Sequence, residues 1–252
     1  MRTPLTLCER VLCRLGLDRL ALRVRAMEFW RNGEPEVRLL PLLVDPRRTA
    51  VDVGASNGFY LWHLMRLAAK VVAFEPNPRS LAELQKAAPG WDIRQLALSR
   101  EKGTTVLRIP VSRNFALTGW GSIHAGNEFS EISVDATQSF TVETARLDDL
   151  GLVDVGFIKI DVEGHENEVL QGALTLLARD RPNVLVEVSG ETRGNDPGAV
   201  CATLRSLGYT TLYLRDGTSL AAIDAVPAGT SAVNIIAIPD AVRMASPARR
   251  DG

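Results

Sequence analysis

Short apolar runs alternate with amphipathic segments along most of the chain after residue 48. The runs that resemble strands are 49–53, 70–75, 91–98, 155–162 and 182–188. Helical patterns follow most of these runs, and this alternation predicts an α/β fold with a mainly parallel sheet between two layers of helices. Two further runs, 209–215 and 231–238, have no helix between them. They predict an antiparallel pair at one edge of the sheet.

Two regions depart from this alternation. Residues 5–31 carry Leu, Val and Met at helical spacings with arginines between them, which predicts one or two amphipathic helices. We interpret residues 1–48 as a helical cap that packs on the main domain (49–240) or on a second subunit. Contact with a membrane surface is the alternative. Residues 99–150 form an insertion rich in Ser, Thr and Gly, and we expect it to act as a lid over the acceptor. The tail, 241–252, is expected to be disordered.

Composition narrows the possible partners and locations. The chain has 252 residues, of which 46% are hydrophobic, and this is enough for one sizeable core. Its formal net charge of −1 argues against nucleic acid as a partner, because phosphate binding needs a basic excess. The three cysteines, Cys8, Cys13 and Cys201, suggest neither a disulfide framework nor a zinc site. With no run of eighteen apolar residues, we expect no membrane span and a cytoplasmic protein.

Carboxylates stand at the ends of four of the five strands in the main alternation. They are Asp52, Glu75, Asp161 and Glu187. Ligands of open parallel sheets bind beyond the carboxyl ends of the strands, and a carboxylate in an apolar setting is costly unless it has a partner or a task. The sequence therefore predicts a ligand site at this edge of the sheet.

The turn after the first strand, DVGASNG, narrows the choice of ligand. Gly54 and Gly58 remove side chains where the backbone would approach a ligand. Glu75 follows at the spacing of an acid that binds a ribose diol. The turn lacks the middle glycine of GxGxxG, which lets a pyrophosphate approach. These features favour S-adenosylmethionine, which is cationic and has no phosphate, over NAD.

Three blocks resemble the FkbM-type S-adenosylmethionine-dependent methyltransferases: VDVGASNGFY, VVAFEPNPRSLAEL and FIKIDVEGHENEVLQGA. The run NVLVEV resembles their fifth strand, and the resemblance spans residues 49–240. It implies a Rossmann-like class I methyltransferase fold of seven strands, the last antiparallel, and O-methylation of sugars or secondary-metabolite alcohols, with S-adenosylhomocysteine as the product. The family usually reads DVGAN-x-G, whereas Ser56 stands at the asparagine here. The residues expected to bind the cofactor are Asp52, Gly54, Ala55, Ser56, Asn57, Gly58, Glu75, Pro76, Ala97 and Asp161.

The block IKIDVEGHE holds the candidates for proton removal. Transfer of a methyl group to a hydroxyl requires a positioned base, and we expect Asp161 or His165 to serve, with Glu187 nearby. The alternative for Glu163 and His165 is that they cap the next helix. A divalent ion bound by Asp161, Glu163 and Glu187 is a further possibility that the resemblance does not require, so no metal is assigned.

Lys159 stands inside an apolar strand, two residues before Asp161 on the same face. We predict a buried ion pair with Asp52 and Glu187, its neighbours in the expected sheet. In the insertion, His124 could reach the substrate. Trp120 could stack on a sugar or anchor the insertion to the core.

Three functional hypotheses remain at this point. The first is an O-methyltransferase that acts on a saccharide or a small natural product. The second is an NAD-dependent oxidoreductase, against which the missing glycine and the IKIDVEGHE block both count. The third is a non-catalytic protein that binds S-adenosylmethionine. The apolar N-terminal helices also predict a possible homodimer.

Overall fold

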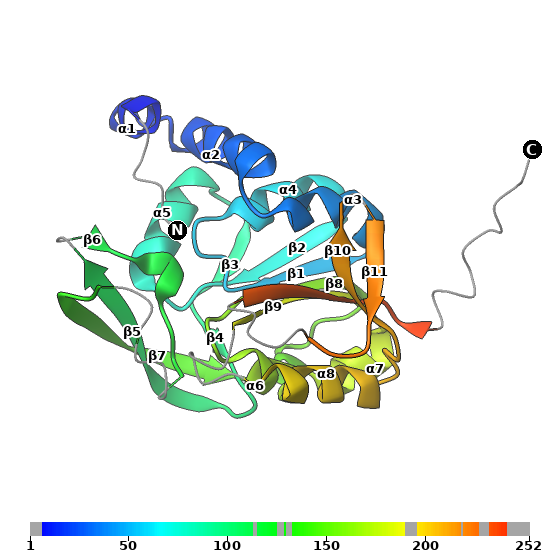
Figure 1. Ribbon diagram of the computed structural model, residues 1–252. Helices are drawn as coiled ribbons and strands as arrows, with labels where there is room; N and C mark the ends of the chain where they lie inside the picture. The colour runs from blue at the N-terminus through cyan, green and yellow to red at the C-terminus, as the bar shows by residue number, and fades with distance from the viewer. Residues whose placement is uncertain are drawn as a thin grey trace, which may run out of the picture.

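The computed structural model describes residues 7–112, 115–124, 129, 133–189, 196–217, 219–226 and 232–240 (Figure 1). The strands are β1 (Thr49–Val53), β2 (Lys70–Phe74), β3 (Asp92–Arg94), β4 (Ala97–Leu98), β5 (Gly103–Ser112), β6 (Phe115–Ala116), β7 (Ala136–Ala145), β8 (Val155–Ile160), β9 (Asn183–Ser189), β10 (Leu212–Asp216), β11 (Ser219–Ile223) and β12 (Ala232–Ala237). The α-helices are α1 (Leu7–Arg14), α2 (Asp18–Asn32), α3 (Leu40–Leu43), α4 (Phe59–Leu67), α5 (Pro78–Ala87), α6 (Glu166–Gln171), α7 (Leu174–Asp180) and α8 (Pro197–Ser206). Short 3-10 helices are η1 (Pro35–Leu39), η2 (Thr118–Trp120) and η3 (Leu147–Leu150).

The central sheet has the strand order β11-β10-β12-β9-β8-β1-β2-β3. Strands β3, β2, β1, β8 and β9 pair in parallel, and β12 is antiparallel to both β9 and β10. This confirms the class I methyltransferase fold with its antiparallel last strand. The sheet has eight strands rather than the expected seven, because β11 folds back on β10 across the turn at Gly217. The antiparallel pair β10–β12 therefore lies inside the sheet, and β11 forms the edge.

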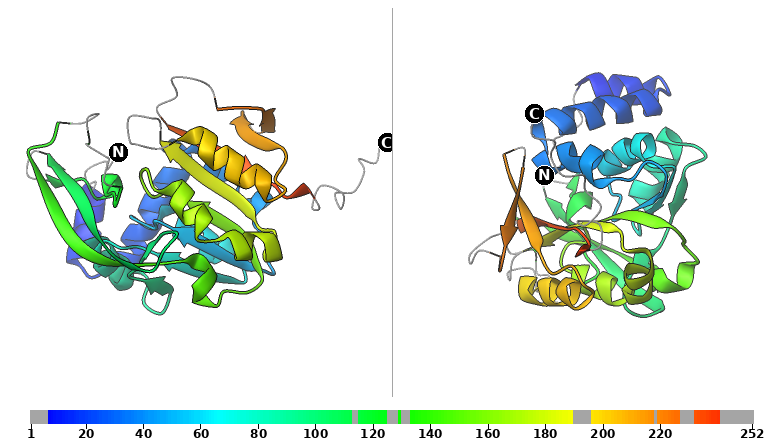
Figure 2. Two further views of the ribbon diagram at one scale, coloured as in Figure 1. Left: turned by 90° about the horizontal axis from the view of Figure 1, so that it is seen from below. Right: turned by 90° about the vertical axis from the view of Figure 1, so that its right-hand side faces the viewer.

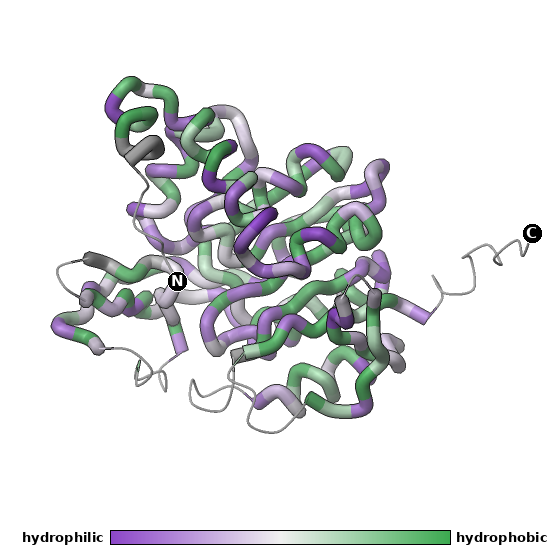
Figure 3. Tube along the Cα trace, turned by 45° about the horizontal axis from the view of Figure 1, so that its top comes forward, coloured by the Kyte–Doolittle hydropathy of each residue, from purple (hydrophilic) through white to green (hydrophobic). Residues whose placement is uncertain are grey.

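Helices cover both faces of this sheet. Helices α2, α4 and α5 lie on one side and α6, α7 and α8 on the other, as the right-hand view of Figure 2 shows. Ala50 and Val51 are neighbours in β1 but belong to different apolar cores, because successive side chains of a strand point to opposite faces. Figure 3 shows the hydrophobic stretches along the central strands that this two-sided burial requires.

Two of the expected elements divide in the structure. The run 91–98 splits into β3, at the edge of the central sheet, and β4, which pairs with β7 in a second sheet of order β4-β7-β5-β6. The helix expected near 165–178 breaks at Gly172 into α6 and α7. A side chain at Gly172 would place a Cβ only 2.1 Å from the carbonyl oxygen of Ser99. The helix break thus lets α6 pack closely against the chain that leaves β4.

The N-terminal segment packs on the main domain through α2. Leu22 and Ala26 of α2 are buried against Trp62 of α4 and Ala87 of α5. This packing corresponds to the interpretation of residues 1–48 as a cap on the main domain. Within the described ranges, no helix has the length and apolar character needed to cross a bilayer. A dimer through α1 and α2 stays a prediction, and the tail 241–252 lies outside the described residues.

Candidate active site

The glycine turn between β1 and α4 fits closely against other parts of the protein. Gly54 has φ +85°, and a Cβ there would lie 1.9 Å from the carbonyl oxygen of Asp161. Gly58 has φ +75°, and its Cβ would lie 2.5 Å from a methyl carbon of Leu84 in α5. The sequence interpretation reserved this space for a ligand. The structure corrects it, because protein atoms fill the space at both glycines.

Glu75 joins the turns that follow β1 and β2. The side chain is buried, and its two oxygens accept hydrogen bonds from the backbone N–H of Ser56 at 2.6 Å and of Asn77 at 2.8 Å. Burial raises the pKa of Glu75 to about 7, although the Asn77 and Ser56 amides lower it. Each carboxylate oxygen has a second lone pair, so Glu75 can still accept hydrogen bonds from a ligand.

Two buried polar atoms near Glu75 have no hydrogen-bond partner, Oδ2 of Asp52 and Oγ of Ser56. Burial raises the pKa of Asp52 to about 7, while Lys159 acts to lower it. Ser56 has φ 44°, in the left-handed region that asparagine adopts more readily than most residues. This conformation explains why asparagine suits the position, and it leaves the shorter serine hydroxyl unpaired.

The other residues expected to bind the cofactor differ in their surroundings. Ala55 is buried, and its N–H donates to the carbonyl of Phe74 at 3.1 Å. Asn57 and Pro76 are half-buried in the two turns. Ala97 is buried in β4 within the apolar core of the second sheet. The structure therefore gathers the turn residues around Glu75 and gives Ala97 a packing role.

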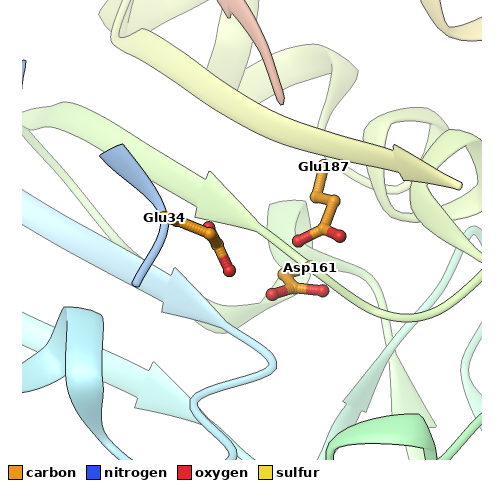
Figure 4. Close-up of side chains that lie close together, drawn as sticks. All are labelled: Glu34, Asp161 and Glu187. Carbon is orange, nitrogen blue, oxygen red and sulfur yellow. The ribbon is translucent and has the colours of Figure 1, made fainter. Parts of the chain in front are cut away.

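Three carboxylates converge beyond β8 and β9. Oxygens of Asp161, Glu187 and Glu34 all lie within 4.8 Å of one another, and Figure 4 shows the side chains pointing toward one another. Glu34 comes from the turn after α2, where no local pattern marks it, so sequence reasoning missed it. The Tyr60 hydroxyl of α4 holds Glu34 by donating a hydrogen bond of 2.8 Å.

Lys159 places a positive charge among these carboxylates. Its side chain is 1% exposed, and Nζ lies 3.6 Å from Asp161 Oδ2 and 4.0 Å from Glu187 Oε2. Burial by itself would lower the pKa of Lys159, but the surrounding carboxylates, Asp161 first, raise it above its usual value. The predicted buried ion pair with Glu187 is confirmed. Asp52 is adjacent to Lys159 in the sheet but makes no ion pair with it.

A single lysine cannot balance three ionised carboxylates. The negative charge of Asp161, together with burial, raises the pKa of Glu187 to about 9. The Glu187 carboxyl therefore favours its protonated form more than an ordinary glutamate does. The three carboxylates could also hold a metal ion, although the Lys159 ammonium already provides one positive charge there.

His165 lies apart from the carboxylate cluster. It occupies the N-cap position of α6 without making a side-chain cap, so the predicted cap is not formed by its ring. Nε2 is 2.9 Å from Ser99 Oγ, and the ring makes no hydrogen bond or ion pair with Asp161 or Glu187. Burial lowers the pKa of His165 to about 4, with help from His124. The structure thus brings Asp161 and Glu187 together and leaves out His165.

The insertion contacts the loop after β8 and the glycine turn. Ser122 Oγ donates a hydrogen bond of 2.7 Å to the carbonyl of Glu163, which has φ 55°. A Cβ at Gly119 in η2 would lie 4.0 Å from Ser56 Oγ.

Sequence reasoning also passed over Glu166, which is buried and accepts from the Gly164 N–H at 3.0 Å. Burial raises the pKa of Glu166 to about 7.

Comparisons with known proteins agree with this geometry. A family described as the methyltransferase FkbM domain matches residues 52–211. The chain is 31% identical over 199 residues to the hexuronic acid methyltransferase AglP of Haloferax volcanii, covering 73% of this chain and 74% of that one. It is 28% identical over 158 residues to the 2-O-methyltransferase NoeI of Sinorhizobium fredii, covering 57% of this chain and 65% of NoeI.

The fold also matches a solved structure of the same kind. The methyltransferase FkbM of Methylobacillus flagellatus superposes with a TM-score of 0.52 at 18% identity. The match covers 88% of this chain and 54% of that protein. The chain therefore spans about half of that protein and about two thirds of NoeI.

Proposed function

The chain belongs to the FkbM family of methyltransferases, and from this premise we propose that it transfers a methyl group from S-adenosylmethionine to a hydroxyl of a saccharide or small natural product. The observation that carries the proposal is the set of carboxylates at the strand ends. Asp52 and Glu75 lie at one side of Asp161, and Glu187 and Glu34 lie at the other. An oxidoreductase that uses NAD is disfavoured, because the family is one of methyltransferases.

Residues at the ends of β1 and β2 suit S-adenosylmethionine. This molecule supplies an electrophilic methyl group on a cationic sulfur when bound. Oδ2 of Asp52 and Oγ of Ser56 are buried without hydrogen-bond partners, as expected of atoms that bond to a ligand. Glu75 is fixed by two backbone amides and keeps free lone pairs toward a ribose diol. These three residues would hold the cofactor.

We assign the role of general base to Asp161. The acceptor hydroxyl must lose its proton as its oxygen bonds to the methyl carbon. Asp161 follows β8 directly, its side chain is part-exposed, and Lys159 Nζ lies 3.6 Å from its Oδ2. Proton transfer to an Asp161 oxygen would place the proton beside Lys159 and within 4.8 Å of a Glu187 carboxylate oxygen. His165 is bonded to Ser99 and is a weaker candidate.

The names of the relatives support an oxygen acceptor on a sugar. One is a 2-O-methyltransferase and the other a hexuronic acid methyltransferase. A carboxylate pair beside an open strand end suits deprotonation of a hydroxyl, which ordinarily needs a base in contact with it. The activity of the whole protein is therefore proposed to be O-methylation.

Two measurements test this function. In the first, S-adenosylhomocysteine and NADH are compared for their effect on the melting temperature. We expect only S-adenosylhomocysteine to stabilise the protein, since a ligand stabilises the state that binds it. In the second, the protein is incubated with methyl-labelled S-adenosylmethionine and a panel of sugars and alcohols. Mass spectrometry should find label on an oxygen. Binding without transfer to any acceptor would instead support a non-catalytic cofactor-binding protein.

A further inference from the structure

A cavity of about 380 Å³ lies beside the carboxylate cluster. Small-molecule sites in proteins occupy roughly 300–1,000 Å³, so this space has the size of a binding site for a small ligand. Its wall includes Glu34 and Glu36 near the start of η1, Glu187 of β9, Arg215 of β10, and Ala232 and Asn234 of β12. The cavity is therefore built over the β9–β12–β10 part of the sheet, away from the turns after β1 and β2.

We propose that this cavity holds the methyl acceptor and selects an uncharged sugar over an acidic one. The inference rests on the proposed function and adds the place and the charge class of the acceptor. We call the residues around Asp52, Ser56 and Glu75 the cofactor half of the site. We call Glu34, Glu36, Glu187, Arg215 and Asn234 the acceptor half.

Asp161 stands between the two halves. Its carbonyl oxygen lies against Gly54 in the cofactor half, because a Cβ on that glycine would be 1.9 Å away. Its carboxylate lies within 4.8 Å of those of Glu34 and Glu187, both of which line the cavity. A hydroxyl bound in the cavity near these two glutamates is thus within reach of the base and faces the cofactor half.

The charges on the cavity wall disfavour an anionic ligand. Three glutamates line the cavity, and Arg215 is the only cation among its described lining residues. Arg215 is already engaged, because its Nε lies 3.4 Å from Glu36 Oε1 and its guanidinium donates to the carbonyl of Gly217. A carboxylate on the acceptor would meet the carboxylate of Glu34, and the one cation of the described wall, Arg215, is already paired with Glu36. Sugar hydroxyls, in contrast, can donate to the glutamates.

Asn234 adds a polar group that can orient a sugar. Its Oδ1 accepts from Lys159 at 3.4 Å, and its Nδ2 lies 3.4 Å from Glu34 Oε2. Asn234 pairs directly with Glu187 across β12 and β9. The amide thus links the buried lysine to the cavity wall, and its second N–H is available for a hydroxyl oxygen.

Most of the acceptor half lies outside the part of the chain that matches the family. The match covers residues 52–211, whereas Glu34 and Glu36 precede it and Arg215 and Asn234 follow it. The residues that form the cofactor half all fall inside it. The choice of acceptor therefore depends in part on segments that flank the family match.

Filling the cavity tests its role. Ala232 is exposed, lines the cavity and lies on the same face of β12 as Asn234. In Ala232→Phe we expect methyl transfer to fall at least tenfold while S-adenosylhomocysteine still raises the melting temperature as in the wild type. Ala221→Phe is the matched control, because Ala221 is an exposed alanine on the edge strand β11 outside the cavity wall. Equal turnover in the two variants would overturn the assignment of the cavity.

The charge class is tested with paired acceptors. Methyl glucoside and methyl galactoside are compared with their uronic acids, using labelled S-adenosylmethionine for transfer and saturation-transfer NMR of the S-adenosylhomocysteine complex for binding. We expect binding and transfer with an uncharged sugar and at least a tenfold weaker response with the acid. Glu36→Gln frees Arg215 and should reduce this preference roughly tenfold, about 1.4 kcal/mol.

The outcomes separate the two proposals. Equal or better use of the uronic acids by the wild type would overturn the charge class while leaving O-methylation intact. Stabilisation by S-adenosylhomocysteine with no transfer to any hydroxyl would instead contradict O-methylation itself. An unchanged preference in Glu36→Gln would also contradict the inference, because the cavity charge would then have no effect on selection.

Discussion

The cofactor half and the acceptor half manage buried negative charge by different means. In the cofactor half, the backbone amides of Ser56 and Asn77 hold the Glu75 carboxylate. These two residues lie in the turns after β1 and β2, within the same short sequence motifs that identify those turns. In the acceptor half and at Asp161 beside it, side chains hold other side chains: Lys159 of β8, Tyr60 of α4 and Asn234 of β12 contact Glu34, Asp161 and Glu187.

The difference has a functional consequence. A charge held by backbone amides keeps its position when neighbouring side chains change, which suits a cofactor that must be held in one fixed position. A charge held by side chains is altered by single substitutions, which suits an acceptor that differs between proteins. Substitutions in the two halves should therefore differ in their effects on turnover and on stability.

Asp161→Asn should reduce turnover by about 10²- to 10⁴-fold, the usual contribution of a general base. The substitution keeps the shape of the side chain and removes its ability to accept the proton. His165→Ala is the comparison, and we expect its turnover to fall less than tenfold, because its ring bonds to Ser99 outside the carboxylate cluster. The measurement is kcat with labelled S-adenosylmethionine. A larger loss in His165→Ala than in Asp161→Asn would reverse the assignment.

Lys159→Met should lower the free energy of unfolding by about 3–5 kcal/mol at pH 8. It leaves the half-buried carboxylates of Asp161, Glu187 and Glu34 without the counter-charge of the lysine. At pH 10 the deficit should be larger, because Glu187, whose pKa is raised to about 9, then ionises beside Asp161 without the lysine. Urea denaturation at both pH values measures it. Lys70→Met, at the exposed start of β2, is the control and should change stability little. An equal deficit at both pH values would argue against carboxylate repulsion as the cause.

Gly54→Ala should lower the free energy of unfolding by roughly 3 kcal/mol through overpacking and backbone strain. The new Cβ would overlap the carbonyl oxygen of Asp161. The resulting displacement of Asp161 would disturb both halves of the site. Gly90→Ala is a matched control, since Gly90 has the same φ of +85° with nothing within 4 Å of an added Cβ. It should cost about 1 kcal/mol. If the two variants were equally stable, the close approach to Asp161 would have no energetic weight.

Asp52→Asn should change the free energy of unfolding least among these variants. It should gain stability relative to the wild type at higher pH and weaken binding of the cofactor. Burial raises the folded-state pKa of Asp52 to about 7. Its contribution to stability is therefore fully present below the unfolded pKa near 4 and is lost as the pH rises through 7. The asparagine variant does not titrate, so its stability relative to the wild type should increase by about 2–3 kcal/mol between pH 5 and pH 8.

The same variant should bind S-adenosylmethionine more weakly, because it lacks the carboxylate that we propose for the cationic end of the cofactor. Denaturation across the pH series and calorimetric binding provide the two readouts. Asp216→Asn, at the exposed end of β10, is the control for the loss of a surface acid. Stability of Asp52→Asn that parallels the wild type at every pH would show that Asp52 does not titrate in this interval.

Local sequence patterns predicted the order of the elements and the carboxylates at the strand ends, and the role of these carboxylates in binding the cofactor stays a prediction. The alternation of apolar runs and helical patterns gave the parallel strands β1, β2, β8 and β9 and their helices, since each pattern reports burial within its own segment. At the start of α5 the Asn77 side chain accepts from the Arg79 N–H at 3.0 Å and Pro78 is the first helical residue, an arrangement that short-range sequence favours. Asp52, Glu75 and Asp161 were found because strand ends of parallel sheets meet at one edge.

Other features were set by contacts between distant segments. Strand β11 was missed because its register with β10 depends on a turn at Gly217 rather than on an apolar pattern. The reason for Gly54 was misassigned, because the carbonyl of Asp161 that fills its space is far along the chain. His165 was favoured for its position in a carboxylate-rich block, but the turn directs its ring to Ser99.

The sequence by itself determined the fold class, the family and the carboxylates at the strand ends, because these depend on short motifs and on the period of burial. Only the tertiary structure decided which carboxylates meet. It brought Glu34, from the turn after α2, to Asp161 and Glu187, and it placed Arg215 opposite Glu36. Such meetings depend on how helices and strands pack over long separations, and no local pattern records that packing.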